Sequence, residues 1–341
     1  MLVFVPVALF ASLLDTPPLV LFFLSALAII PLAKFIGEAT DHLARRAGVG
    51  VGGLLNATFG NAAELIIAFF ALRAGLIGIV KASIIGSIVG NILLVMGASM
   101  FAGGLVFSSQ KFNRTAVLSS GSTLLLAVIA LVMPAIFLLT APGVETAVIE
   151  DLSIAVAVLM IGIYGASLIF SLYTHKHLYV EEVAEYESHW SNRKSLIVLF
   201  SSTAAIALMS ELLIGAVEPI VQSLGWTEMF IGVIFVAIIG NVAEHSSAIL
   251  VSIKNRMDLS IQIALGSATQ IAMLIAPLLV LLSFFFETHV TLVFGMFELV
   301  TVVLAVLIAN LVIEDGESNW FEGLQLLTAY IIIGVAFYFH P

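Results

Sequence analysis

Two short motifs each place a glutamate three residues after an asparagine inside an otherwise apolar run. They are Gly60-Asn61-Ala62-Ala63-Glu64 and Gly240-Asn241-Val242-Ala243-Glu244, and they lie 180 positions apart. At the same offset Gly86-Ser87 returns as Gly266-Ser267, without a gap. Charged side chains are costly inside a membrane, so two of them at matched positions of repeated segments indicate function. We therefore predict that Glu64 and Glu244 form one composite cation site.

The residue types around these carboxylates are those that bind a hard cation. Positions i and i+3 of a helix share a face, so each asparagine points the same way as the glutamate of its motif. The motif glycines remove side-chain bulk, which allows close helix approach or a locally opened backbone whose carbonyls face a cation. Calcium takes about six to eight oxygen ligands, whereas the Cys and His cluster of a zinc or copper site is absent. The predicted calcium and proton site comprises Glu64, Glu244, Asn61, Asn241, Gly60 and Gly240, with Ser87, Asn91, Ser267, Gln270 and His245 in support.

The pair of carboxylates suggests an exchange mechanism. Two ionised carboxylates that lie close together in a low dielectric repel each other and lose hydration. One divalent cation neutralises the pair, and so do two protons. Because metal ligation needs deprotonated carboxylates, the metal and the protons compete for the same oxygens. A site that is neutral when loaded and costly when bare crosses the membrane as a loaded unit, which is the requirement for antiport.

Several supporting residues have two interpretations that the sequence leaves open. Serine and amide side chains also join membrane helices by hydrogen bonds. His245 has Leu65 as its counterpart in the first motif, and it either modulates proton coupling or is a hydrogen-bonded spacer. Glu38 and Glu218 also lie at the 180-residue offset, near span ends, and they either line an access route or are solvated helix-end carboxylates.

The elements that must position this site are membrane-spanning helices. The chain is 61% hydrophobic and 10% charged, whereas a soluble domain carries roughly a quarter charged residues. Apolar runs near ~20 residues recur along it, as bilayer-spanning helices require, so we predict an all-α polytopic membrane protein and not a β-barrel. The eleven predicted spans, or ten if the short first one does not cross, are 2–14, 18–36, 53–73, 77–103, 115–139, 150–174, 194–222, 227–253, 259–286, 289–313 and 319–339.

The distribution of Lys and Arg predicts the orientation of these spans. Ten of the 12 basic residues fall on one side, and only Arg73 and Lys81 fall on the other. The ten are Lys34, Arg45 and Arg46 after the second span, Lys111 and Arg114 after the fourth, Lys176, Arg193 and Lys194 after the sixth, and Lys254 and Arg256 after the eighth. The heavily basic side is cytoplasmic by the positive-inside rule. With eleven spans the N-terminus lies inside and the C-terminus outside.

The two motifs fall on the third and eighth spans, which are five crossings apart and so run in opposite directions. We therefore predict two inverted five-helix repeats, a topology that places the substrate site near the midplane between the halves. The predicted divisions are an extra N-terminal helix at 1–16, a first repeat at 17–174, an acidic cytoplasmic linker helix at 175–193 and a second repeat at 194–341. The four glutamates of the linker form either a secondary cation sensor or a solvated surface; they are Glu181, Glu182, Glu185 and Glu187.

Three stretches resemble the calcium/proton exchangers of the calcium/cation antiporter superfamily. The segment 53–64 resembles the first signature of that family, 240–245 the second, and 315–323 a loop typical of it. The resemblance implies eleven helices with an acidic helix between two inverted halves, Glu64 and Glu244 as the calcium and proton carboxylates, and His245 as the histidine linked to proton coupling. Gly-Asn stands where sodium/calcium relatives typically show a Ser- and Pro-containing signature, which favours protons. The short N-terminus lacks the autoinhibitory extension of plant vacuolar members and suggests a prokaryotic cell-membrane protein.

The function that we expect is secondary active export of cytosolic calcium, in exchange for protons, by alternating access. The partners would be the calcium ion, protons and the lipid bilayer, with calcium as transported substrate and no cofactor. Nothing resembles a basic nucleic-acid surface, and homo-oligomerisation is left open. The alternatives are a sodium-coupled or broader divalent-cation exchanger of the same fold and, from another class, a cation channel. A membrane-embedded enzyme is disfavoured because no nucleophile set or metal-ligand histidine spacing is evident.

Overall fold

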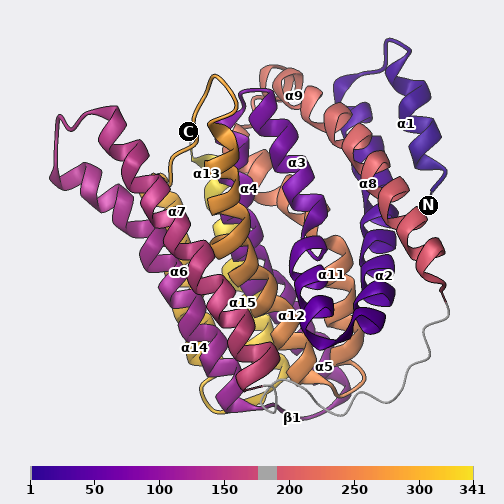
Figure 1. Cartoon of the computed structure of the whole chain (residues 1–341), viewed down its shortest axis with the longest axis vertical. Helices are drawn as coiled ribbons and strands as arrows, with labels where there is room; N and C mark the ends of the chain where they lie inside the picture. The colour runs from indigo at the N-terminus through magenta and orange to yellow at the C-terminus, as the bar shows by residue number, and fades with distance from the viewer. Residues whose placement is uncertain (1, 176–189, 341) are drawn as a thin grey trace.

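The computed structural model describes residues 2–175 and 190–340. Apart from two strands of two residues each, the regular structure of these residues is helical (Figure 1). Helices satisfy their own backbone hydrogen bonds, which apolar surroundings demand. Within the described residues eight helical stretches are long and apolar enough to cross a membrane, and α14 is a shorter one. The prediction of a polytopic all-helical membrane protein is confirmed. The predicted linker segment at 176–189 lies outside the described residues.

The element order follows the predicted spans closely. The elements up to the linker are α1 (Phe4–Ser12), α2 (Pro18–Phe59), α3 (Ala62–Arg73), α4 (Ile77–Val89), η1 (Gly90–Val95), α5 (Met96–Val106), β1 (Gln110–Lys111), α6 (Arg114–Thr140), α7 (Thr146–Ile169) and η2 (Phe170–Thr174). Those after it are α8 (Asn192–Gly215), α9 (Val217–Leu224), α10 (Glu228–Phe230), η4 (Ile231–Val236), α11 (Ala237–Ser252), α12 (Met257–Gln270), η5 (Ile271–Ile275), α13 (Ala276–Ser283), α14 (Met296–Val312), β2 (Glu317–Ser318) and α15 (Trp320–Phe339).

The second and third predicted spans are joined by a bend inside α2. A Cβ on Gly52 would lie 2.3 Å from the backbone oxygen of Ala44, whereas residues eight apart in a straight helix are separated by about 12 Å along its axis. The end of α2 therefore folds back beside its own earlier turns, and Gly37 and Asn56 line the same cavity. The helix is interrupted at Asn61, whose φ of −104° and ψ of 35° are not helical.

The predicted span 289–313 begins too early. Helix α14 starts only at Met296, and the apolar residues before it form a buried loop. Val290 donates its backbone N–H to Ser283 Oγ over 2.9 Å, and Leu292 donates to Ser153 Oγ over 3.1 Å. Side-chain hydroxyls thus satisfy this backbone without a helix, so its hydrophobicity reflects burial and not a helical turn.

Helices α4 and α12 form the centre of the molecule. They carry Ser87 and Ser267, which lie at the 180-residue offset. In an apolar stretch of 18 residues within Ile77–Val106, 89% of the residues are buried. The corresponding share is 72% within Met257–Ser283 and 22% within Thr146–Thr174. Near the turn that joins them, helices α6 and α7 project away from the rest of the bundle (Figure 1), whereas the remainder of α6 packs against α12 and α14 and that of α7 against α13. Within the described residues, the π-helical segments η1, η4 and η5 interrupt helices and η2 ends α7, and such turns often mark functional sites.

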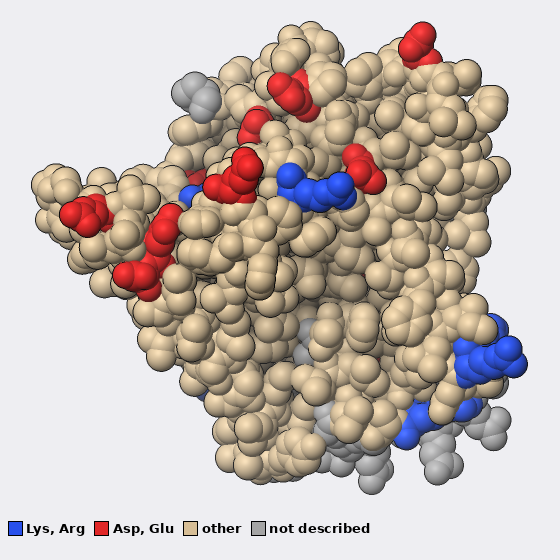
Figure 2. Space-filling view, turned by 45° about the horizontal axis from the view of Figure 1, so that its top comes forward, with Lys and Arg blue, Asp and Glu red and all other residues tan. Residues whose placement is uncertain are grey.

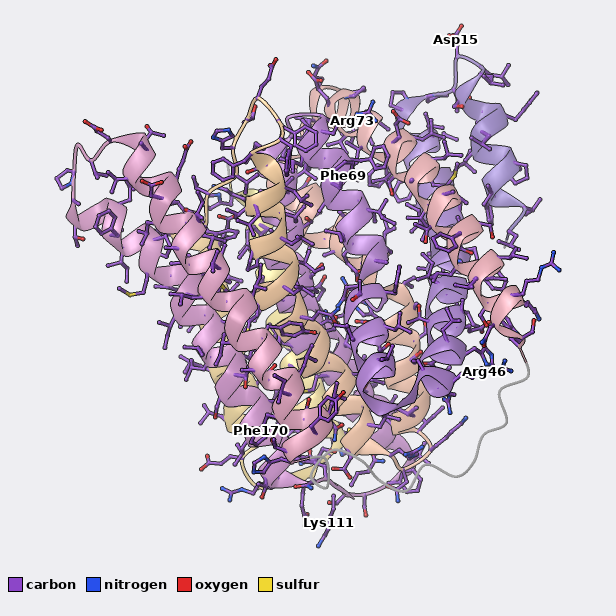
Figure 3. The ribbon with its side chains drawn as sticks, viewed as in Figure 1. Asp15, Arg46, Phe69, Arg73, Lys111 and Phe170 are labelled. Carbon is purple, nitrogen blue, oxygen red and sulfur yellow. The ribbon has the colours of Figure 1, made fainter. Side chains whose placement is uncertain are left out.

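Acidic side chains occur at both ends of the bundle, whereas a group of basic side chains marks one end (Figure 2). Figure 2 shows acidic side chains over the end that is turned forward, and a group of basic side chains at the opposite edge. In Figure 3 Asp15, Phe69 and Arg73 lie at one end, whereas Arg46, Lys111 and Phe170 lie at the other. Arg46 and Lys111, two of the residues that sequence analysis assigned to the cytoplasmic side, therefore share one end (Figure 3), which we call the basic end.

A two-stranded antiparallel sheet joins two loops at the basic end. Gln110 pairs with Ser318, and Lys111 pairs with Glu317. The Glu317 carboxylate accepts a hydrogen bond from Ser109 Oγ over 3.0 Å and lies 3.3 Å from Lys111 Nζ. These two partners lower the pKa of Glu317. The 315–323 stretch that resembles a family-typical loop thus closes the basic end of α14 and α15.

Candidate functional site

The two motifs meet in the middle of the bundle. Gly240 and Glu244 lie on α11, Gly60 lies at the break between α2 and α3, and Glu64 lies in the first turn of α3. A Cβ on Gly240 would lie only 2.9 Å from Cγ of Glu64, and a Cβ on Gly60 would lie 3.7 Å from Oε1 of Glu244. Each motif glycine therefore faces the glutamate of the other motif. Their missing side chains let the two carboxylate-bearing segments approach.

Hydrogen bonds between the asparagine of one motif and a serine of the other half repeat in both directions. Asn241 donates from Nδ2 to Ser87 Oγ over 2.9 Å. In the reciprocal pair, Ser267 donates from Oγ to Asn61 Oδ1 over 3.0 Å. Asn91 then joins the two pairs, because its Nδ2 donates to both Asn241 Oδ1 and Ser267 Oγ over 3.0 Å. Five buried polar side chains thus hold α4, α11, α12 and the α2–α3 break in one register.

Three of the four carboxylate oxygens of the two glutamates are left without partners among the described residues. Both oxygens of Glu64 and Oε2 of Glu244 are buried, and they accept no hydrogen bond from the described residues. Neither glutamate forms a salt bridge with a described residue. Leaving buried acceptors unsatisfied costs about 1–3 kcal/mol each, and more for charged groups. The arrangement is therefore suited to a positive partner that enters and leaves.

Glu244 faces a cavity of about 110 Å³. Its walls come from α2, the α2–α3 break and α11; they are Ala33, Ile36, Gly37, Asn56, Phe59, Gly60, Ala63, Gly240, Ala243 and Glu244. The α2 part of the wall includes Ala33 and Gly37, which flank Lys34 in the sequence. Glu64 does not line this cavity but faces a second one of about 10 Å³. The walls of the second cavity are Glu64, Ala68, Ser83, Ile84, Ser87, Val236, Ile271 and Ile275. The two carboxylates therefore face different spaces.

The other predicted supporting residues lie close to the motifs. Gln270 is near the first motif, since its Oε1 lies 3.7 Å from the position of a Cβ on Gly60. His245 is 9% exposed, and its Nε2 is buried without a hydrogen-bond partner among the described residues. The roles predicted for these two residues stay predictions.

The two weak access-route candidates lie on different helices, Glu38 on α2 and Glu218 on α9. Glu38 pairs with Lys34 at 3.7 Å and directly follows Gly37, which lines the larger cavity. Glu218 accepts a hydrogen bond from Gln222 over 3.3 Å and lines neither cavity. Both carboxylates stand outside the central hydrogen-bond network, and the proposal that they guide ions stays a prediction.

Two residues beside the carboxylates were missed from the sequence. Ser83 lines the small cavity of Glu64, and its position four residues before Ser87 and eight before Asn91 was a usable helical signal. Tyr164 of α7 is 8% exposed and lies within electrostatic range of Glu244. No sequence pattern links Tyr164 to the motifs, since it comes from a different part of the chain.

The donor set matches an oxygen-seeking cation. No group of three or more His, Cys, Asp and Glu that could hold a metal occurs within residues 2–175 and 190–340. A bound cation would therefore depend on the two glutamates as its charged ligands, completed by amide and hydroxyl oxygens. Such ligands suit calcium, which accepts carboxylates, amide oxygens and water in flexible geometry.

Known proteins share both the sequence and the fold. A family model described as sodium/calcium exchanger protein matches residues 17–173 and 194–339. The chain is 45% identical over 359 residues to a Ca(2+)/H(+) antiporter of Synechocystis sp., covering 100% of this chain and 96% of the relative. It is 46% identical over 340 residues to the Ca(2+)/H(+) antiporter ChaA of Bacillus subtilis, covering 98% and 96%.

Solved structures of exchangers share the fold of this chain. The structure of native YfkE matches with a TM-score of 0.86 and 43% identity, covering 98% of this chain and 97% of that chain. The H+/Ca2+ exchanger CAX matches with a TM-score of 0.74 at 15% identity, covering 98% and 90%. The second likeness concerns the fold alone.

Proposed function

Because the chain belongs to the sodium/calcium exchanger protein family, we propose that it is a calcium/proton antiporter that exports cytosolic calcium. Relatives that carry this activity in their names match over nearly the whole chain. The observation that carries the site assignment is the reciprocal packing of each glutamate against the glycine of the other motif. It brings together two buried carboxylates, and three of their four oxygens have no described partner.

The charges of the site explain the exchange. Calcium enters from the basic, cytoplasmic end through the cavity that reaches Glu244, and both glutamates become its charged ligands. Two protons neutralise the same pair after calcium has left on the other side. Since calcium binding needs deprotonated carboxylates, the two cargoes exclude each other. Loading by either one removes the net charge that would make movement of the site through the membrane costly.

Alternating access follows from the inverted repeats that we propose for 17–174 and 194–341, after an extra helix at 1–16. The family model matches two separate stretches, 17–173 and 194–339, which supports a duplication. Gly37 and Asn56 of α2 line the larger cavity, which supports a conformation that is open toward the cytoplasm. Exchange of conformations between the halves would open the opposite side around the same fixed site.

The family makes this protein an exchanger and not an enzyme, and its helices make it a multi-pass membrane protein. The relatives named above from Synechocystis sp. and Bacillus subtilis are bacterial, which supports a prokaryotic cell membrane as its location. In this orientation the C-terminus is outside, because it lies at the end opposite the basic end (Figure 1) and the basic end faces the cytoplasm. A cytoplasmic N-terminus requires α1 to cross, whereas its nine residues span about 14 Å, less than the bilayer core of about 30 Å.

The test is calcium uptake by sealed vesicles with an imposed pH gradient, with calcium and pH read together. We expect uptake that requires the pH gradient, moves protons in the opposite direction, and does not respond to a sodium gradient. Glu64→Gln and Glu244→Gln should each abolish exchange, whereas Glu287→Gln on an exposed outer loop should not. Full coupled exchange in either site variant would refute the assignment. Sodium-driven uptake would favour the sodium-coupled alternative, manganese uptake would show a broader exchanger, and flux indifferent to both gradients would indicate a channel.

A further inference from the structure

The small cavity beside Glu64 has the size and the polarity to hold one water molecule. Its volume of about 10 Å³ is close to the lower limit of roughly 10–15 Å³ that a single water needs. Three of its walls are polar: the carboxylate of Glu64 and the hydroxyls of Ser83 and Ser87. The remaining walls are aliphatic, so a molecule in this space has only these three polar groups as partners.

The three polar groups retain hydrogen-bond donors and acceptors that their existing hydrogen bonds do not use. Ser83 donates from Oγ to the backbone oxygen of Val80 over 2.9 Å, so its lone pairs remain for a donor. Ser87 accepts from Asn241 over 2.9 Å and donates to no described residue. Both oxygens of Glu64 are buried acceptors without a described partner. A water there would donate to Glu64 and to Ser83 and would accept from Ser87, which makes the three bonds typical of buried water.

We propose that Ser83 and Ser87 hold one water molecule against the Glu64 carboxylate, and that Ser83 is a positioning residue for calcium binding. The effect on calcium rests on the proposed function of Glu64, whereas the water site itself does not. While Glu64 is closed off from the larger cavity, this water replaces the solvent that the carboxylate has lost. It fixes the orientation of the carboxylate and supplies one further oxygen to a cation that retains part of its hydration.

The proposed water site has no counterpart in the second half of the protein. At the offset of 180 positions Ile263 occupies the place of Ser83, so the second half has no equivalent hydroxyl. Glu244 needs none in this conformation, because it lines the cavity of about 110 Å³. Identical carboxylates are thus solvated in different ways, one by a placed water and one by an open cavity.

The experiment compares Ser83→Ala with Ser25→Ala in the full-length protein. Ser25 is 0% exposed and its Oγ also has no described partner, but it lines neither cavity. For Ser83→Ala we expect the KM for calcium to rise about tenfold with an unchanged maximal rate, which corresponds to about 1.4 kcal/mol. Ser83→Thr, which keeps the hydroxyl, should restore most of the affinity, and Ser25→Ala should match the parent protein.

Infrared spectroscopy supplies a readout that a merely structural role would not move. The carboxylate band that disappears in Glu64→Gln should shift in Ser83→Ala and stay in place in Ser25→Ala. In the unaltered protein, a water band sensitive to heavy-oxygen water should also disappear in Glu64→Gln. An unchanged Glu64 band and KM in Ser83→Ala, or the absence of that water band, would overturn the proposal. Loss of exchange in Glu64→Gln separates this result from failure of the proposed function.

Discussion

Replacing Gly240 by alanine tests whether the close approach of the two motifs is what makes the site. The added Cβ would lie 2.9 Å from Cγ of Glu64 and 3.4 Å from its Cδ. Ordinary carbon–carbon contact is about 3.5–4.0 Å, so Glu64 has to move by roughly 0.6 Å or more. The oxygen ligands of calcium lie within a range of only about 0.3 Å. The displacement is therefore larger than the coordination geometry tolerates.

We expect Gly240→Ala to raise the KM for calcium in vesicle uptake by at least about tenfold, equivalent to about 1.4 kcal/mol. The free energy of unfolding should not fall in proportion, because alanine inside a helix is favoured over glycine by about 0.8–1.0 kcal/mol. Uptake over a range of calcium concentrations, paired with thermal unfolding in detergent, separates the two effects.

The matched control is Gly266→Ala. Gly266 lies on α12 directly before Ser267, and a Cβ on it would meet no atom within 4 Å. This variant should transport with the parent KM. A parent-like KM in Gly240→Ala would show that Glu64 does not need its observed position. Equal loss in Gly266→Ala would show that any added methyl near the site is harmful, and the argument from close approach would fail.

Three further predictions follow from the network, the cavity and the sheet. Asn241→Ala should lower the free energy of unfolding by about 1–3 kcal/mol. It should lower it more than Asn61→Ala does, because Asn241 bonds to several partners in the central network and Asn61 to one. Chemical denaturation of both variants measures the difference, and a larger loss in Asn61→Ala would contradict the prediction. The chain has no cysteine, so a single introduced cysteine reports on access. In the inward-facing protein, a cysteine at position 37 should react with a membrane-impermeant thiol reagent from the cytoplasmic side, whereas one at position 217, its buried counterpart at the 180-residue offset, should not react. Equal labelling of the two positions would count against the assigned access. Because the pKa of Glu317 is lowered in the folded protein, its carboxylate adds stability above the unfolded pKa near 4.5. This contribution is lost as the pH falls through the lower folded pKa. Thermal unfolding of Glu317→Gln should therefore show a weaker loss of stability in acid than the parent protein, and parallel curves would exclude the contribution.

The sequence was sufficient to predict which residues meet but not how the chain turns between them. The register of 180 positions is a property of the sequence alone, and it predicted without any coordinates that Glu64 and Glu244 belong to one site. That each motif glycine faces the glutamate of the other motif appears only in the structure. The fold of α2 back on itself at Gly52 depends on contacts between residues far from each other along the helix. The early start assigned to α14 had a related cause, because hydropathy reports that Val290 and Leu292 are buried and does not report whether they are helical.

The most informative difference between sequence and structure is that equal residues have unequal surroundings. Gly86 and Gly266 occupy equivalent places in the register, yet a Cβ on Gly86 would lie 2.3 Å from the backbone oxygen of Val233, whereas one on Gly266 would touch nothing. Glu64 and Glu244 likewise face cavities of about 10 and 110 Å³. Related segments that adopt two different environments in one molecule show that this type of segment is compatible with both. A second conformation in which the environments are exchanged is then accessible at modest cost, and loading of the shared site by calcium or protons has only to bias an equilibrium between two such states.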